Sequence, residues 1–193
     1  MIGKLDQELF LFINSFNSPF WDNIMYAVSG RLIWVPLYLC ILYVLGAKLK
    51  RKMFILIPII IIAVTLCDQI SVHLFKEVFH RLRPCHEPSL EGLIHLVRGQ
   101  CGGQYGFVSS HATNSFNVAL LSLLFIRERW FTIIILLWAT IICYSRIYLG
   151  VHYPGDVFGG AFLGSAIGYA TWATYNFVDR KYLVHKEYFN PSK

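Results

Sequence analysis

Four residues in the second half of the chain have types and spacing that could carry phosphate chemistry. Ser145 and Arg146 are followed by His152 and, four residues later, by Asp156. The stretch lies between two long apolar runs, and charged groups beside a membrane are costly unless something compensates them. A histidine can attack phosphorus or transfer a proton near neutral pH, and a carboxylate at this spacing can orient its ring. The stretch therefore predicts a nucleophilic pair, His152 and Asp156, beside an anion-binding arginine.

Two earlier clusters fit the same chemistry. The first runs over residues 76–84, and the second is Val108-Ser109-Ser110-His111. Lysine and arginine suit phosphate oxygens, and hydroxyls beside backbone N–H groups at a helix N-terminus form an anion site. His111 is a second histidine able to transfer protons. The phosphate-binding set expected from these clusters is Lys76, Arg83, Ser109, Ser110 and Arg146.

The chain that positions these residues is strongly apolar. Of its 193 residues, 56% are hydrophobic and 15% are charged, whereas a soluble domain usually carries about 25% charged residues. The apolar residues come in blocks, so we expect residues 1–193 to form one membrane-embedded domain. The net charge of +6 is divided among short loops without a basic face, which argues against nucleic acid as a partner. Residues 1–6 lack the features of a signal peptide, so the apolar runs themselves are expected to direct insertion.

The apolar runs predict an all-α bundle of about five transmembrane helices. Each run approaches the roughly 20 residues that cross the hydrocarbon layer. Before them, residues 1–29 show helical spacing of apolar residues without an uninterrupted span, which favours an interfacial helix on the membrane. A helix packed on the bundle is the alternative. The five expected spans cover about 32–47, 53–75, 110–126, 130–145 and 157–178.

The basic residues set the expected orientation. Ten of the seventeen Lys and Arg lie at 48–52, at 127–129 and in the tail at 179–193. By the positive-inside rule this side is cytoplasmic. The loop at 76–109 is then extracytoplasmic, and we expect the site to face the periplasm from the inner membrane of a bacterium. Arg81 in this loop is expected to anchor lipid head groups.

Two further patterns concern structure. Cys85 and Cys101 both lie in the outer loop, where a disulfide can persist, so we predict a bond between them, with two free thiols as the alternative. A zinc site is disfavoured because no paired Cys-x-x-Cys is present, and no metal is expected. Gly160, Gly164 and Gly168 repeat every fourth residue, which predicts a helix face for close packing.

Together the three polar clusters resemble the type 2 phosphatidic acid phosphatase superfamily. Its signatures are Lys-x6-Arg-Pro, Pro-Ser-Gly-His and Ser-Arg-x5-His-x3-Asp. Residues 76–84 match the first signature and residues 145–156 match the third in full. In the second, Val108 replaces the proline and Ser110 replaces the glycine. The resemblance covers about 53–178. Many members of the family have six spans, and five are expected in this chain, without the first.

The resemblance implies a metal-independent lipid phosphatase without a cofactor. His152 would attack phosphorus to form a phosphohistidine, Asp156 would orient it, and His111 would protonate the leaving oxygen. Undecaprenyl diphosphate is the first-ranked substrate, ahead of lipid A phosphates and then phosphatidic acid or phosphatidylglycerol phosphate. A non-catalytic anion- or lipid-binding membrane protein is the rival hypothesis, and both histidines and Asp156 count against it because binding alone needs none of them. A phosphotransferase acting between lipids is a third.

Overall fold

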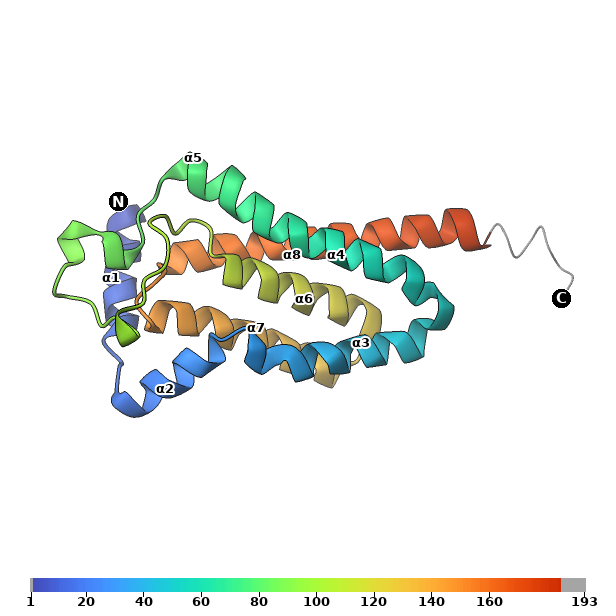
Figure 1. The fold of residues 1–193 in the computed structure, drawn as a ribbon, viewed down its shortest axis with the longest axis horizontal. Helices are drawn as coiled ribbons and strands as arrows, with labels where there is room; N and C mark the ends of the chain where they lie inside the picture. The colour runs from blue at the N-terminus through green and yellow to red at the C-terminus, as the bar shows by residue number, and fades with distance from the viewer. Residues whose placement is uncertain (1, 185–193) are drawn as a thin grey trace, which may run out of the picture.

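The computed structural model describes residues 2–184, and that part of the chain is built from helices joined by loops. The longer helices run beside one another, and the shorter ones gather at one end of the bundle (Figure 1). The α-helices are α1 (Ile2–Asn14), α2 (Pro19–Val28), α3 (Val35–Leu49), α4 (Met53–Gln69), α5 (Glu77–Phe79), α6 (Ser110–Ile126), α7 (Arg129–Tyr148) and α8 (Pro154–Val178).

Short helical turns connect or extend these helices. A π-helical turn carries α4 onward to the first polar cluster, so the run predicted over 53–75 forms one continuous rod that ends beside the loop. The π turns are Ile70–Lys76 and Asp179–Val184, and the 3-10 turns are Leu32–Trp34, Lys50–Lys52, Pro84–His86, Pro88–Leu90 and Val97–Gly99.

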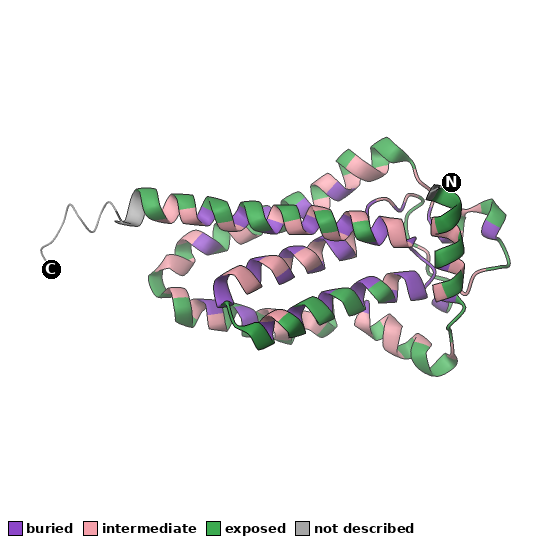
Figure 2. Ribbon diagram, turned by 180° about the vertical axis from the view of Figure 1, so that it is seen from behind, coloured by how far each residue is buried: buried purple, intermediate pink, exposed green. Residues whose placement is uncertain are grey.

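The all-helical prediction is confirmed, and α6 has the bounds predicted for the third span. Within residues 2–184, two helical stretches, Leu32–Phe79 and Arg129–Tyr148, are long and apolar enough to cross a membrane by length and composition. α6 is shorter and carries serines and asparagines, because it lies inside the bundle and its polar groups bond to neighbouring turns. In Figure 2 the central helix is mostly buried or half-buried, whereas the outer faces of its neighbours are exposed.

The close-packing face predicted on α8 is confirmed. A Cβ added at Gly160 would lie 2.5 Å from the carbonyl oxygen of Ser109, and one at Gly164 would overlap the carbonyl of Thr113. At Gly168 the nearest atom is the backbone oxygen of Asn117, at 3.0 Å. The glycines therefore let α8 touch the backbone of α6, which sets the separation of the two helices that carry His111 and Asp156.

The two ends of the bundle differ in composition. The α3–α4 link, the α6–α7 turn and the end of α8 lie together, since Lys48 Nζ donates to the carbonyl of Ile126 at 2.8 Å and Lys52 pairs with Asp179 at 2.9 Å. The loop over 80–109 and α1 occupy the opposite end (Figure 1). The described basic residues predicted to be cytoplasmic are thus at one end and the three polar clusters at the other. Lys186 and Lys193 of the predicted tail lie outside the described residues.

Helix α1 packs on the bundle, which is the alternative considered for it, and its location at a membrane surface stays a prediction. Phe10 is fully buried and packs edge-to-face on Tyr153, with ring centroids 5.4 Å apart. Leu5 and Phe12 on the rest of the helix are more than half exposed, as is Phe16 in the turn that follows it. One face therefore docks on the bundle and the other presents apolar side chains outward.

The loop over 80–109 is closed by the disulfide predicted between Cys85 and Cys101, whose Cα atoms lie 6.0 Å apart. A short antiparallel pairing also crosses it, in which Arg83 N donates to Gln104 O at 3.1 Å and Gly106 N donates to Arg81 O at 2.8 Å. In extended chain, residues two apart face the same way. The pairing therefore directs Arg81 and Arg83 to the same side.

We expect Gly164→Ala to destabilise the fold, because its new methyl group would force α8 away from Thr113 of α6. Overpacking of this kind lowers the free energy of unfolding by roughly 1–3 kcal/mol. Gly46→Ala in α3 is the matched control, since a Cβ there meets no atom within 4 Å. Thermal unfolding in detergent should show a lower midpoint for Gly164→Ala alone, and equal midpoints would contradict the helix contact.

Candidate active site

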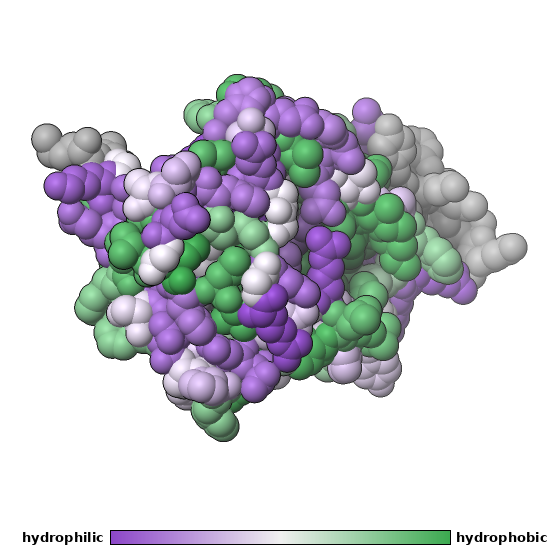
Figure 3. Space-filling model, turned by 60° about the vertical axis from the view of Figure 1, so that its left-hand side comes forward, coloured by the Kyte–Doolittle hydropathy of each residue, from purple (hydrophilic) through white to green (hydrophobic). Residues whose placement is uncertain are grey.

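The three polar clusters meet at the end of the bundle that carries the loop. The backbone N–H of Ser109, at the start of α6, donates to the carbonyl of Asp156, in the first turn of α8, at 3.0 Å. Figure 3 shows this end of the molecule, where hydrophilic residues surround smaller hydrophobic patches. The close contact of α6 and α8 thus brings the second and third clusters together.

His152 lies in the link between α7 and α8, with its imidazole held from both sides. Its Nδ1 is 3.4 Å from Oδ2 of Asp156, and its Nε2 is 3.0 Å from Nη1 of Arg83. The same Arg83 nitrogen donates to the carbonyl of Val151 at 3.2 Å. Nδ1 therefore faces the carboxylate, as predicted, and Nε2 faces a cation that can also bind phosphate.

The surroundings of His152 keep its imidazole neutral. Burial, followed by the positive charges of Arg83, Arg146 and Lys76, lowers the pKa of His152 well below its usual value. A neutral ring carries a lone pair on one nitrogen, as a nucleophile requires, and here the lone pair of Nε2 is directed at Nη1 of Arg83. Because the ring is neutral, its contact with Asp156 is a hydrogen bond rather than an ion pair.

Asp156 is fully buried at the N-terminus of α8. Its Oδ2 accepts a hydrogen bond from the backbone N–H of Tyr153 at 3.0 Å, which caps the helix. Its Oδ1 accepts from Nη1 of Arg81 at 2.8 Å. The carboxylate is therefore fixed by a backbone donor and a guanidinium as well as by His152.

Lys76 and Arg146, the other predicted phosphate-binding cations, form hydrogen bonds with uncharged side chains. Lys76 Nζ, at the end of the π turn, donates to Oγ of Ser110 at 2.8 Å. Arg146 Nη1 donates to Oγ of Ser29. The substitution of serine for glycine in the second signature thus gives Lys76 a hydroxyl partner.

Several buried donors have no hydrogen-bond partner within the described protein. Three of them belong to the predicted phosphate-binding residues, namely Arg83 Nε, Arg146 Nε and Ser109 Oγ, and Ser109 does not cap α6 with its side chain. Buried polar atoms are nearly always bonded, so unpaired donors at one end of a bundle fit a site for an anion. A phosphoryl group has oxygen acceptors for all three.

His111 lines a cavity of about 400 Å³ that enters the bundle between α3, α4 and α6. Ser110, His111 and Arg31 line the end nearest the site, the polar mouth. Farther along α6 the lining combines apolar residues, such as Leu45 and Leu121, with the polar Asn117 and Ser122. Arg31 and His111 therefore face the same cavity. The cavity therefore joins the polar site to the apolar interior.

The structure brings the predicted residues together at one end, with His152 in contact with Asp156 and Arg83, and Lys76 with Ser110. The expectation that Arg81 anchors lipid head groups is wrong, because two carboxylates take up its guanidinium. In the sequence Arg81 and Arg83 carry the same local signal, because both are basic residues of the loop predicted to lie outside the membrane. The residues that the sequence analysis missed are Asp6, Ser29, Arg31 and Gly106.

Among the described residues, one group of three potential metal ligands lies close together, namely Cys85, His86 and Cys101. Its two sulfur atoms are joined in the disulfide, so neither is a free thiolate that could ligate a metal. It also lies outside the cluster around His152.

Comparison with known proteins agrees with the geometry. Residues 54–180 match the family model described as the PAP2 superfamily. A lipid A 4′-phosphatase of Bacteroides thetaiotaomicron is 40% identical over 176 residues, which cover 90% of this chain and 77% of that protein. An undecaprenyl-diphosphatase of Sulfolobus acidocaldarius is 29% identical over 84% of this chain and 74% of its own.

A solved structure has the same fold. The PAP2-type phosphatidylglycerolphosphate phosphatase from Bacillus subtilis matches with a TM-score of 0.71 and 20% identity, over 93% of this chain and 89% of the other. The chain belongs to the PAP2 superfamily, the type 2 phosphatidic acid phosphatases, and it is a membrane lipid phosphatase.

We expect Gly106→Ala to impair catalysis without unfolding the protein. A Cβ at Gly106 would lie 2.8 Å from Oδ2 of Asp156 and 3.2 Å from Cγ of Arg83, so both side chains must move. Displacement by about 1 Å can reduce turnover by roughly 100-fold. Gly103→Ala, in the same loop, meets no atom within 4 Å and is the control. Phosphate release and thermal unfolding midpoints should be measured for both variants. Equal turnover in the two would contradict the predicted displacement of Asp156 and Arg83.

Proposed function

We propose that this member of the PAP2 superfamily removes a phosphate group from lipid A in the outer leaflet of the cytoplasmic membrane. The observation that carries a lipid substrate is the cavity beside His111, which runs from Ser110 past Leu121 to Ser122. At 1.5 Å per residue this is about 18 Å along α6. A hydrocarbon chain in this cavity leaves its phosphate at the polar mouth.

The choice of lipid A rests on relatedness. The Bacteroides lipid A 4′-phosphatase is 40% identical to this chain, whereas the Sulfolobus undecaprenyl-diphosphatase is 29% identical. This difference moves lipid A phosphates ahead of undecaprenyl diphosphate, the substrate ranked first from the motifs. The motif residues are expected to contact only the phosphate, so the remainder of the lipid must be recognised by other parts of the protein.

Catalysis proceeds in two displacements in this proposal. Nε2 of His152 attacks phosphorus, the phosphorus–oxygen bond to the lipid breaks, and His111 gives a proton to the departing oxygen. Water, losing a proton to His111, then attacks the phosphohistidine and releases inorganic phosphate. Asp156 accepts the Nδ1–H of His152 and holds the ring while it gains positive charge.

The phosphoryl oxygens need donors throughout both steps. Arg83 Nη1 lies 3.0 Å from the attacking nitrogen, so it can bind an oxygen of the phosphoryl group as the bond forms. Lys76, Ser109, Ser110 and Arg146 complete the cradle in this proposal. Preorganised donors of this kind stabilise charge that develops in the transition state. No metal or cofactor takes part in the proposed reaction.

The proposed membrane arrangement follows from the two ends of the bundle. Helices α3, α4, α6, α7 and α8 cross the bilayer, and α1 lies at the outer surface with Leu5 and Phe12 toward lipid. The basic end faces the cytoplasm under the positive-inside rule. The site then faces the periplasm of a bacterial inner membrane, close to the head groups.

Undecaprenyl diphosphate is the second candidate, and the volume of the cavity favours it. A single cavity of about 400 Å³ suits one chain more readily than the several acyl chains of lipid A. A diphosphate would also extend beyond the site of attack, where Arg31 lines the mouth.

Phosphate release by the purified protein in detergent tests the function. We expect lipid A to be the best substrate in a panel with undecaprenyl diphosphate and phosphatidic acid, and we expect turnover to survive EDTA. His152→Ala should reduce turnover by about 10⁴-fold or more, as loss of an essential nucleophile does elsewhere.

The controls separate the claims. His86→Ala removes a loop histidine that lies away from the cluster and should retain activity. A preference for undecaprenyl diphosphate would transfer the assignment to the second candidate. Full activity in His152→Ala would contradict the assignment of His152 as the nucleophile. No turnover of any lipid by the wild type would favour a non-catalytic binding protein.

A further inference from the structure

Arg81 joins the catalytic end of α8 to the N-terminal helix. Its Nη1 donates to Oδ1 of Asp156 at 2.8 Å, and its Nη2 donates to Oδ2 of Asp6 in α1 at 2.5 Å. The side chains of Asp156 and Asp6 are 0% and 13% exposed, and that of Arg81 is 29% exposed. One guanidinium is therefore shared by two largely buried carboxylates.

Asp6 makes a second contact with the same turn of α8. Its Oδ1 accepts from the backbone N–H of Gly155 at 2.8 Å, one residue before Asp156. The guanidinium of Arg81 lies over the ring of Tyr153, 4.3 Å from its centroid, and Phe10 of α1 packs on the same ring. Polar and aromatic contacts thus fix α1 against the residues that flank Asp156.

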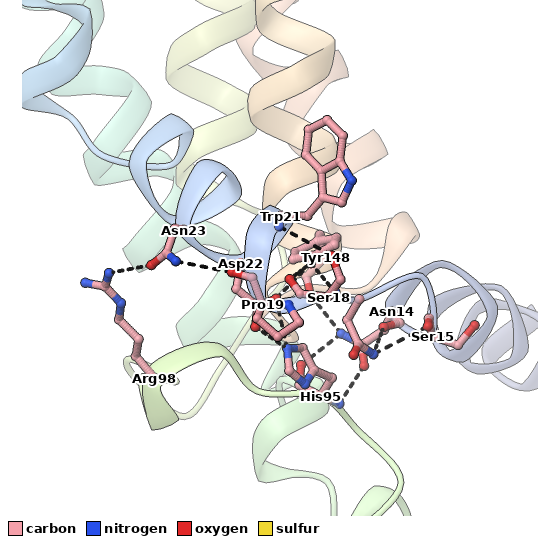
Figure 4. Close-up of polar contacts among 11 residues, drawn as sticks. Asn14, Ser15, Ser18, Pro19, Trp21, Asp22, Asn23, His95, Arg98 and Tyr148 are labelled. Carbon is pink, nitrogen blue, oxygen red and sulfur yellow. Dashed lines mark hydrogen bonds and ion pairs between the residues drawn. The ribbon is translucent and has the colours of Figure 1, made fainter.

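The far end of α1 is fixed as well. Asn14 Nδ2 donates to the carbonyls of Tyr148 at 2.8 Å and His95 at 3.0 Å, and its Oδ1 accepts from the N–H of His95 at 2.7 Å. Tyr148 and His95 both bond to the carboxylate of Asp22 in α2 (Figure 4). α1 is therefore held at both ends and cannot move without disturbing Arg81.

Charge explains why Asp156 needs this support. A buried carboxylate is strongly disfavoured unless it is paired and hydrogen-bonded. His152 is neutral, and Arg83 directs Nη1 to His152 and Val151. The direct ion pair of Asp156 with a permanent cation is therefore the one with Arg81.

We propose that Arg81 and Asp6 are positioning residues for the phosphatase reaction, and that they hold the Asp156 carboxylate in the orientation that His152 requires. The inference rests on the roles proposed above for His152 and Asp156. It gives α1 a part in catalysis, because its first turns carry one of the two groups that fix Arg81. Arg81 itself does not bind the phosphate, since its two terminal nitrogens are directed at carboxylates.

The experiment compares Arg81→Gln, Arg81→Lys and Asp6→Asn with the wild type in detergent, using lipid A and undecaprenyl diphosphate as probes. We expect Arg81→Gln to lower kcat by about 100-fold and to leave KM within about threefold, as loss of orientation rather than binding does. Arg81→Lys should recover part of the loss. Asp6→Asn should lower kcat by about three- to tenfold, and its effect should nearly vanish when Arg81 is already glutamine.

The pH dependence gives a readout that a general loss of stability would not move. Without Arg81 the charged form of Asp156 is less favoured, so its protonation occurs at higher pH. The acid limb of kcat/KM should therefore shift upward by about one pH unit in Arg81→Gln and return toward its original position in Arg81→Lys. The charged and titratable groups around Asp156 are Arg81, Arg83, Lys76, Asp6, His152 and Tyr153.

Arg98→Gln is the matched control. Arg98 belongs to the same loop, donates to Asn23 at 3.1 Å and lies over the ring of Tyr26, so it ties the loop to α2 rather than to Asp156 (Figure 4). We expect its kcat and pH profile to match those of the wild type.

The outcomes are separable. Failure of the wild type to release phosphate would defeat the proposed function. With an active wild type, an Arg81→Gln variant with unchanged kcat and pH profile would overturn the positioning role, and a raised KM with unchanged kcat would assign Arg81 to phosphate binding instead. If Arg81→Gln does not fold, Arg81→Lys and Asp6→Asn decide the matter by the same readouts.

Discussion

The burial of the Asp156 carboxylate is the constraint that organises this end of the protein. A carboxylate that is fully enclosed must find several donors, and here they come from segments far apart in the chain. The backbone N–H of Tyr153, the guanidinium of Arg81 and the imidazole of His152 supply them. Each donor also has a second role, because Tyr153 is the N-cap of α8, Arg81 fixes α1, and His152 lies at the centre of the site. Satisfying one carboxylate therefore assembles the loop, α1 and α8 around the proposed nucleophile.

That assembly depends on the close contact of α6 and α8. Gly160 and Gly164 allow the α8 backbone to touch that of α6, and larger residues would separate Ser109 and His111 from the first turn of α8. The carbonyl of Asp156 then receives the N–H of Ser109. In a bilayer, small residues of this kind are the usual means of close helix association, because lipid is as apolar as the side chains. The packing and the chemistry are thus parts of one arrangement, in which the glycines set the spacing that the polar groups use.

Features that depend on neighbouring residues could be predicted from the sequence, whereas contacts between residues far apart in the chain could not. The bounds of α6 follow from the polar cluster at Ser109 and from the apolar run that ends before Arg127. The loop cysteines were correctly paired because the loop contains two of them. Arg81 was misjudged, since its partners Asp6 and Asp156 lie 75 residues away in each direction. No local pattern marks such a contact, and a basic residue beside a membrane normally suggests lipid head groups. Asp6 carried even less signal, because an acidic residue near a helix start is common on any surface.

The partners of the cations separate two kinds of positive charge in the site. Lys76, Arg83 and Arg146 bond to neutral groups, namely the hydroxyls of Ser110 and Ser29, the carbonyl of Val151 and the imidazole of His152. Their positive charge therefore remains available to a phosphate, which carries up to two negative charges. Arg81 binds two carboxylates and has little net charge to offer. This division agrees with the proposed roles, in which Arg81 positions Asp156 and the other three cations bind the phosphate. The sequence alone presents all four as equivalent basic residues, and the identity of their partners is what distinguishes them.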